Sequence, residues 1–422
     1  MLLTRLLMPF AVASLIAVSA GATANAQIAP PSPAPDTKSA SPQNTPSPAA
    51  PLAPAPALPP PAPFEQALLN AATDLFTKVK MPDGAPMPSQ LVIDPLIDGM
   101  TGIQSVATRS MERRIIDIVK KSYTNFSVQP FTTAAVAKSP VVLVGTFTPI
   151  SLKTDGPRDA FRVCLALLDL KSGKIVSKGF ARATMEGIDH TPVAYFNDSP
   201  VWTNDPATVA YIKSCQGTKA GDPISQAYAD RVLSAAFLSD AINAYEDKRY
   251  GESLELYKTA LTTPGGDQLR AYNGMYLANL KLKRKQPAAE AFAKVIDYGL
   301  ANEKLAVKFL FKPGSNQLWS DSKTKTPYTM WLKTIAEKAA ARNACLEIVG
   351  HSSSTGPEPI NLRLSALRAE YIKDRLESSV SGLSKRLISH GVGSKEPLIG
   401  IGSDDARDAL DRRVEFKSLG KC

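Results

Sequence analysis

Histidine and cysteine, on which metal sites and much nucleophilic catalysis depend, are scarce in this chain of 422 residues. The three histidines are His190, His351 and His390, and the four cysteines are Cys164, Cys215, Cys345 and Cys422. No Cys-x-x-Cys pair is present, which excludes zinc ribbons and thioredoxin-like redox motifs. A zinc hydrolase needs two or three histidines with a carboxylate, and these histidines stand in unrelated contexts. We therefore expect no catalytic residue, no metal site and no cofactor: the protein is not expected to be an enzyme.

Long hydrophobic runs are absent beyond the N-terminus. No later apolar run reaches the roughly 18 residues of a membrane-spanning helix, so we expect no transmembrane span in the mature chain. Residues 1–26 have the form of an export signal, with a positive charge, an apolar stretch and the small-x-small cleavage site Ala24-Asn25-Ala26. No cysteine follows this site to carry a lipid anchor. An uncleaved N-terminal anchor is the alternative, but the apolar stretch Leu6–Ala20 is short for a bilayer.

Proline is abundant in one place only. Residues 27–63 hold 14 of the 34 prolines, and proline both fixes φ and removes a backbone donor. We expect a disordered linker, extended over roughly 115 Å at about 3.1 Å per residue. A spacer across part of the cell envelope is the favoured interpretation, and a specific proline-motif ligand is the alternative.

The rest of the chain predicts a multidomain α/β and α protein with three folded segments. Residues 64–222 show an αβαβ pattern followed by an antiparallel meander. Helices are expected at 64–79 and 104–122, and strands at 91–94, 125–131, 139–150, 161–170 and 175–183, the last two joined by a Ser-Gly turn. The strings LVGTF and LLDLKSGKIV resemble the periplasmic fold shared by the LpoB synthase activators, the curli-secretion protein CsgG and the TolB N-terminal domain. The resemblance implies a binding or assembly domain.

Residues 223–300 are expected to be all helical. Tyr250, Ser253, Tyr257 and Ala260 occupy positions where a tetratricopeptide helix pair has aromatic and small residues. The pattern returns at Ala288, 35 residues after Ser253, close to the tetratricopeptide period of 34. The segment therefore resembles two such repeats, and because about three are needed for stability, a neighbouring domain must cap them.

Residues 301–422 predict a βαβαβ order. It begins with a strand bearing Val307, Phe309 and Phe311, and ends with the strand in DRRVEFKSL. Four strings occur in it: F-x-x-G-S-x-x-L from Phe311, Gly350-His351, N-x-x-L-S-x-x-R-A from Asn361 and D-R-R-V-E from Asp411. With these strings the segment resembles the OmpA C-terminal peptidoglycan-binding family.

This resemblance implies a site for the diaminopimelate of the peptidoglycan stem peptide. In the family an arginine takes the carboxylate of diaminopimelate, and an aspartate takes its ammonium group; the arginine corresponds to Arg368. The aspartate position holds Ser353, which supplies a hydroxyl but no charge, so binding is expected to be weaker or altered unless Glu358 replaces the acid. Asn361 and Arg413 complete the peptidoglycan-binding residues that the resemblance implies.

The four cysteines of an exported chain are expected to pair. Pairing within each folded segment favours Cys164–Cys215 and Cys345–Cys422. We interpret the whole chain as a non-enzymatic, periplasmic scaffold of the Gram-negative envelope, associated with the outer membrane or the cell wall. Its C-terminal domain would bind peptidoglycan and residues 64–300 would bind envelope proteins, with no role for nucleic acid. The alternative is an oligomeric outer-membrane assembly or secretion component of the curli-export type.

Overall fold

A computed structural model describes residues 59–79, 87–138, 140–153, 158–202, 204–309, 311, 314–318, 327–399, 402, 410–419 and 422. The expected export signal and nearly all of the proline-rich segment lie outside these residues. Ala62, near the end of that segment, pairs in parallel with Ala183. Its amide donates to Arg182 O at 3.0 Å, and its carbonyl accepts from Thr184 N at 2.9 Å. The last residues before the first helix are therefore held against a strand, so the linker expected over 27–63 is ordered at its end.

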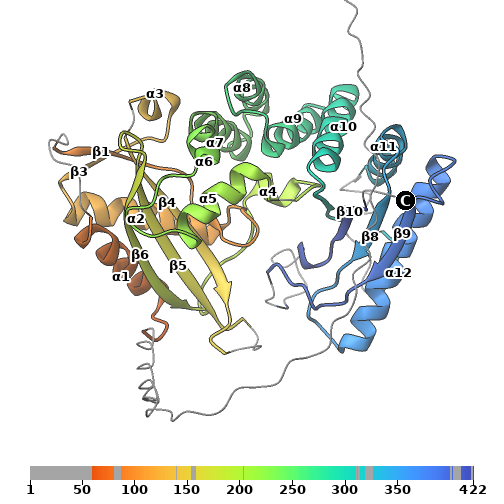
Figure 1. The fold of residues 1–422 in the computed structure, drawn as a ribbon, viewed down its shortest axis with the longest axis horizontal. Coiled ribbons are helices and arrows are strands. Elements are labelled where there is room, and N and C mark those ends of the chain that lie inside the picture. Colours follow the sequence, from red (N-terminus) through yellow and green to blue (C-terminus); the bar gives the residue numbers. More distant parts are fainter. Residues whose placement is uncertain are drawn as a thin grey trace, which may run out of the picture. The chain divides into compact units, whose positions relative to one another are not determined.

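A mixed sheet forms the core of the first segment (Figure 1). Its strands are β1 (Ser89–Ile93), β2 (Ile97–Asp98), β3 (Phe126–Gln129), β4 (Val141–Ile150), β5 (Ala160–Asp169) and β6 (Lys174–Thr184). The order is β3-β1-β4-β5-β6, with β2 also paired to β4. β1 pairs in parallel with β3 and β4, whereas β4, β5 and β6 are antiparallel neighbours. The meander expected from the sequence is thus the second half of this sheet.

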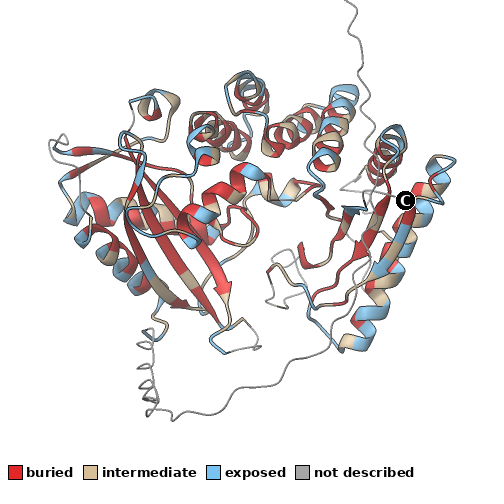
Figure 2. Cartoon of the chain, in the orientation of Figure 1, coloured by how far each residue is buried: buried red, intermediate tan, exposed pale blue. Residues whose placement is uncertain are grey.

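Helices cover both faces of this sheet. On one face α1 (Phe64–Thr77) and α2 (Val106–Ser122) pack against side chains such as Leu143. On the other face, Val142 and Val144 pack with residues of α3 (Thr133–Val136), α5 (Pro206–Gln216) and α6 (Gln226–Ala229). Successive residues of a strand point to opposite faces, and a sheet covered twice therefore needs an unbroken apolar strand. This explains the run VVLV in β4, which is buried throughout (Figure 2).

Helix α1 also covers the edge strand β6. A Cβ on Gly179 would lie 2.1 Å from Ala71 O, so only glycine permits this close approach. Ser177 Oγ donates to Leu75 O at 2.6 Å, and Phe180 N donates to Asp74 Oδ2 at 3.2 Å. The helix thus satisfies part of an edge that would otherwise offer free backbone groups to another strand.

Both expected disulfides are confirmed. Cys164 of β5 is bonded to Cys215 of α5, with 6.0 Å between their Cα atoms. Cys345, just before β8 (Leu346–Gly350), is bonded to Cys422, with a Cα separation of 5.3 Å. The first bond joins a helix to the sheet beneath it. The second joins the residue Cys422 to the start of a strand 77 residues earlier.

Four helices follow α4 (Ala194–Asp198) and α6, and neighbours along the chain pack on one another. They are α7 (Val232–Glu246), α8 (Tyr250–Thr262), α9 (Leu269–Lys281) and α10 (Lys285–Ala301). Tyr257 of α8 is fully buried against Gly274 of α9, where a Cβ would lie 2.1 Å from the ring. Gly274 therefore lets α8 and α9 approach closely, while the tetratricopeptide character of these helices stays a prediction.

The C-terminal region contains a four-stranded sheet and the helices α11 and α12. Its elements are β7 (Leu305–Val307), α11 (Tyr328–Ala341), β8, α12 (Glu358–Ser379), β9 (Leu387–Gly391) and β10 (Val414–Ser418). The strand order is β7-β10-β8-β9, antiparallel except for β8 and β9. The expected βαβαβ order omitted β9 and is corrected to βαβαββ. Its sequence LISHG is short, with Ile388 51% exposed, and so lacks the apolar run of a central strand.

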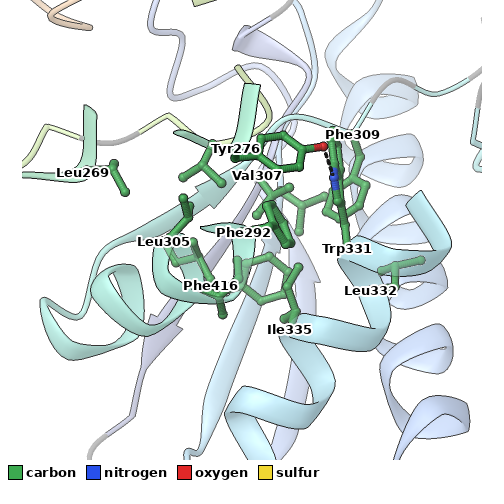
Figure 3. Close-up of a cluster of buried hydrophobic side chains, with 14 of the residues drawn as sticks. Leu269, Tyr276, Phe292, Leu305, Val307, Phe309, Trp331, Leu332, Ile335 and Phe416 are labelled. Atoms are coloured by element: carbon green, nitrogen blue, oxygen red, sulfur yellow. Dashed lines mark hydrogen bonds between the residues drawn. The ribbon is translucent and has the colours of Figure 1, made fainter. Parts of the chain in front are cut away.

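The helical segment and the C-terminal sheet share one hydrophobic core (Figure 3). Phe292 of α10 stacks on Trp331 of α11, with ring centroids 5.7 Å apart and planes inclined by 19°. Trp331 Nε1 donates to the hydroxyl of Tyr276 in α9 at 2.7 Å. Leu305 and Phe416 of the sheet belong to the same cluster. The same hydrophobic core continues across residue 300, where the sequence predicted a domain boundary.

Candidate ligand-binding site

Three connecting segments meet at the start of α12. They are the loop 351–357 after β8, the segment that follows β9 and the residues that precede β10. Ser352 N donates to Gly393 O at 2.9 Å, and His351 N donates to Arg413 O at 3.0 Å. The parallel pairing of β8 with β9 and the antiparallel pairing of β8 with β10 bring these segments to one end of the sheet.

Arg368 lies on the buried side of α12 and is 3% exposed. Its Cζ lies 4.9 Å from the centroid of the Phe311 ring. Its Nε donates to Ser315 O at 3.2 Å. A guanidinium held over an aromatic face and bonded at Nε has a fixed plane, which is the arrangement that forked recognition of a carboxylate requires.

Two residues that contact Arg368, Phe311 and Ser315, come from the opening string F-x-x-G-S-x-x-L. Phe311 is its first residue, and Ser315 is its serine. Sequence reasoning identified the string but gave neither residue a role at the site. The aromatic and the serine of this string were the available signal. The structure shows that this string orients Arg368.

Ser353 and Asn361 lie near the N-terminus of α12 and are 6% and 5% exposed. Asn361 Nδ2 donates to Gly356 O at 3.3 Å, which closes the loop between β8 and the helix. The hydroxyl of the neighbouring Ser352 is buried and has no hydrogen-bond partner among the residues that the structure describes. The loop that carries Ser353 is thus fixed at both ends, and the role of Ser353 and Asn361 in binding stays a prediction.

Glu358, the acid considered as a replacement for the family aspartate, is engaged elsewhere. Both of its carboxylate oxygens accept from Ser394 N at 3.3 Å, and Ser394 Oγ donates to Oε2. Gly393 has φ of +62°, and a Cβ there would lie 2.1 Å from Glu358 Oε1. The carboxylate therefore holds the segment after β9 against α12.

Arg413 is 4% exposed, and its guanidinium is used inside the domain. Nε donates to Glu415 Oε1 at 2.6 Å, and Nη1 donates to Glu396 O at 3.3 Å and to Leu410 O at 3.4 Å. These bonds tie the segment after β9 to the start of β10. They give Arg413 a positioning role, while contact with a ligand stays a prediction.

His351 is 1% exposed between these segments. Burial, reinforced by the positive charges of Arg413 and Lys417, lowers the pKa of His351 to about 3. The imidazole is therefore neutral at physiological pH. Within the described ranges, no three His, Cys, Asp or Glu side chains are grouped so that they could hold a metal ion.

Residues 310–409 match the family model described as the OmpA family. The C-terminal region contains an OmpA-like domain. Omp38, an outer membrane protein from two strains of Acinetobacter baumannii, is 33% identical over 94 residues, which are 22% of this chain and 26% of each relative. The chain thus spans about a quarter of the length of these curated relatives.

Solved structures similar to this region include two envelope proteins. The peptidoglycan-associated lipoprotein from Burkholderia pseudomallei is 23% identical and is matched over 27% of this chain and 89% of its own, with a TM-score of 0.23. The cell wall anchor of the T6SS from Pseudomonas aeruginosa is 20% identical and is matched over 30% of this chain and 95% of its own, with a TM-score of 0.24. Among the described helices, none is both long and apolar enough to cross a membrane.

Proposed function

We propose that this protein is a non-enzymatic envelope scaffold whose C-terminal domain binds the diaminopimelate-containing stem peptide of peptidoglycan. The observation that carries the proposal is Arg368, whose plane is fixed by Phe311 and Ser315 inside a domain that matches the OmpA family. In this proposal Arg368 takes the carboxylate of diaminopimelate. Ser353 then faces the ammonium group with a hydroxyl alone, which supports a modest affinity.

The surrounding residues support a preorganised site. Glu358 and Arg413 each use their charge to hold the segment after β9, so neither must be reorganised when a ligand binds. Preorganised groups lose less conformational freedom on binding and therefore bind more tightly than mobile ones. In this proposal Asn361 likewise keeps the Ser353 loop in place.

We further propose that the export signal delivers the chain to the periplasm and that the proline-rich segment acts as a spacer. Residues 64–300 then bind envelope proteins through an α/β domain like those of LpoB, CsgG and TolB and through helices of tetratricopeptide type. The two disulfides support an oxidising compartment, because disulfides form and persist in such compartments.

Co-sedimentation with isolated sacculi tests the proposed function. Because the C-terminal sheet shares its core with α9 and α10, the experiment uses the whole chain from Gln27 onward and not the C-terminal fragment. We expect the parent protein to sediment with sacculi and the Arg368→Ala variant to remain in solution while the domain stays folded. Failure of the parent to sediment would overturn peptidoglycan binding, and ring-sized particles in electron microscopy would favour the secretion alternative.

A further inference from the structure

The segment Glu396–Ile399, between β9 and β10, is held from the side of its own domain by two residues of the D-R-R-V-E string. Asp411 Oδ1 accepts from Leu398 N at 2.7 Å and from Ile399 N at 2.9 Å. Arg413 Nη1 donates to Glu396 O at 3.3 Å. Asp411 thus fixes the amides of Leu398 and Ile399, and Arg413 fixes the carbonyl of Glu396.

The carbonyl side of the same segment is held by Arg158, which lies just before β5 in the α/β segment. Arg158 Nη2 donates to Pro397 O at 2.8 Å, and Nη1 donates to Ile399 O at 3.0 Å and also to Leu398 O. One guanidinium thus bonds three successive carbonyls. A planar fork with several fixed donors can do this, whereas a single ammonium group cannot match the geometry.

Apolar contacts surround this bridge. Leu410 and Ile399 form a buried cluster with Ile103, and Trp202 and Phe196 pack against it. Trp202 Nε1 donates to Thr101 O, which fixes the indole in this cluster. The residues whose carbonyls bind Arg158 are therefore also covered by residues 101–103 and 196–202 of the first segment. Two independent kinds of contact, polar and apolar, join the α/β segment to the same short stretch of the OmpA-like domain.

That stretch lies beside the candidate ligand-binding site. It continues from Gly393 and Ser394, which bond Ser352 and Glu358, and it leads to Gly402, whose carbonyl accepts from Thr355 Oγ1 at 3.4 Å. The contacts of Gly393 and Gly402 fall on the loop that contains Ser353, and the contact of Ser394 falls on the first turn of α12. A shift of 396–399 would therefore move the backbone that lines the loop.

We infer that Arg158 is a positioning residue for the peptidoglycan site, through which the α/β segment sets the affinity of the OmpA-like domain. The inference rests on the proposed function and goes beyond it, because it couples the two ends of the folded chain. A protein partner that pulls the β4–β5 connection away from the segment Glu396–Ile399 would lower the affinity of the OmpA-like domain for peptidoglycan. Ligand binding would in turn favour the docked arrangement, since coupling between two sites is reciprocal.

The test measures the affinity of the whole chain from Gln27 onward for a soluble stem peptide that contains diaminopimelate. We expect Arg158→Ala to weaken binding about tenfold, which corresponds to about 1.4 kcal/mol. Arg158→Lys keeps the charge but not the fork, and it should restore only part of the affinity. Hydrogen exchange at the amides of Leu398 and Ile399 should become faster in both variants.

Lys153→Ala is the matched control, because it removes the same charge from the same β4–β5 connection at an exposed position. It should leave affinity and exchange unchanged. Equal affinity of the parent, Arg158→Ala and Arg158→Lys would overturn the inference while leaving the proposed function intact. If Arg158→Ala does not fold, full affinity in Arg158→Lys alone overturns it. A parent that binds no stem peptide overturns the proposed function and this inference together.

Discussion

The guanidinium of Arg368 lies over the ring of Phe311, with Cζ 4.9 Å from the ring centroid. The two residues are more than fifty positions apart in the chain, and the contact brings the opening string of the OmpA-like domain onto its longest helix. This pairing makes the orientation of Arg368 dependent on an aromatic residue that carries no charge itself.

Replacement of Phe311 by leucine should weaken binding of the stem peptide about three- to tenfold. A cation over an aromatic ring gains about 0.5–2 kcal/mol, and leucine keeps the apolar volume without the ring. Phe309→Leu is the matched control, since Phe309 is fully buried and faces Trp331 and Tyr328 instead of Arg368. Calorimetric titration of both variants checks this. Equal losses in the two would mean that only the stability of the core matters.

Restoring the family acid should tighten binding. Ser353→Asp places a carboxylate where the ammonium group of diaminopimelate is expected, and a charge-assisted hydrogen bond is about twice as strong as a neutral one. Ser354→Asp adds the same charge one residue later at an exposed position and should have little effect. Affinity for the stem peptide is the measurement. Tightening by Ser354→Asp to the same degree would assign the gain to general charge attraction.

The disulfide Cys345–Cys422 should stabilise the C-terminal region by about 2–4 kcal/mol, because it closes a long loop in the unfolded chain. Denaturant unfolding of the parent and the Cys345→Ser/Cys422→Ser double variant measures this difference. The variant should keep its affinity for peptidoglycan, since neither cysteine lies among the candidate binding residues. Unchanged stability would contradict the pairing, and so would two free thiols in the parent.

Asp94 should make the stability of the α/β segment depend on pH. Burial raises the pKa of Asp94 from 3.8 to about 7, although a hydrogen bond from Tyr228 and the charge of Arg270 oppose this. Between about pH 4 and 7 the folded state therefore holds a proton that the unfolded state has released. The contribution of this group to the free energy of unfolding falls as pH rises through that window and is level above it.

The Asp94→Asn variant removes this dependence while it keeps an acceptor for the hydroxyl of Tyr228, which lies 2.8 Å from Asp94 Oδ2. Relative to the parent, the variant should gain about 2–4 kcal/mol between pH 4 and pH 8. Urea unfolding at several pH values checks this. Parallel stability curves for parent and variant would show that Asp94 ionises normally in the folded protein.

The sequence predicted the elements whose signals are local. The β5–β6 hairpin follows from two apolar runs around the Ser-Gly turn, where Gly173 adopts φ of +67°. The disulfides followed from assigning each cysteine to a folded segment. The short strand β9 was missed because its exposed residues, such as Ile388, interrupt the apolar pattern.

Of the candidate site, only the residues that lie in sequence motifs could be predicted from the sequence. Arg368 follows from the string that contains it, but its burial against Phe311 depends on how the chain returns to α12. Arg158 carries no local signal, because the carbonyls it bonds lie about 240 residues further along the chain. The packing of α10 on α11 could not be predicted from the sequence either, because each helix alone shows an ordinary apolar face.

One comparison of two ligands tests the central claim most directly. A stem peptide with lysine in place of diaminopimelate keeps the ammonium group and lacks only the carboxylate that Arg368 is proposed to take. Calorimetric titration of the chain from Gln27 onward should show binding of the diaminopimelate peptide at least tenfold tighter than the lysine peptide. In Arg368→Ala this difference should disappear. Equal binding of the two peptides by the parent, or an undiminished preference in Arg368→Ala, would contradict the account.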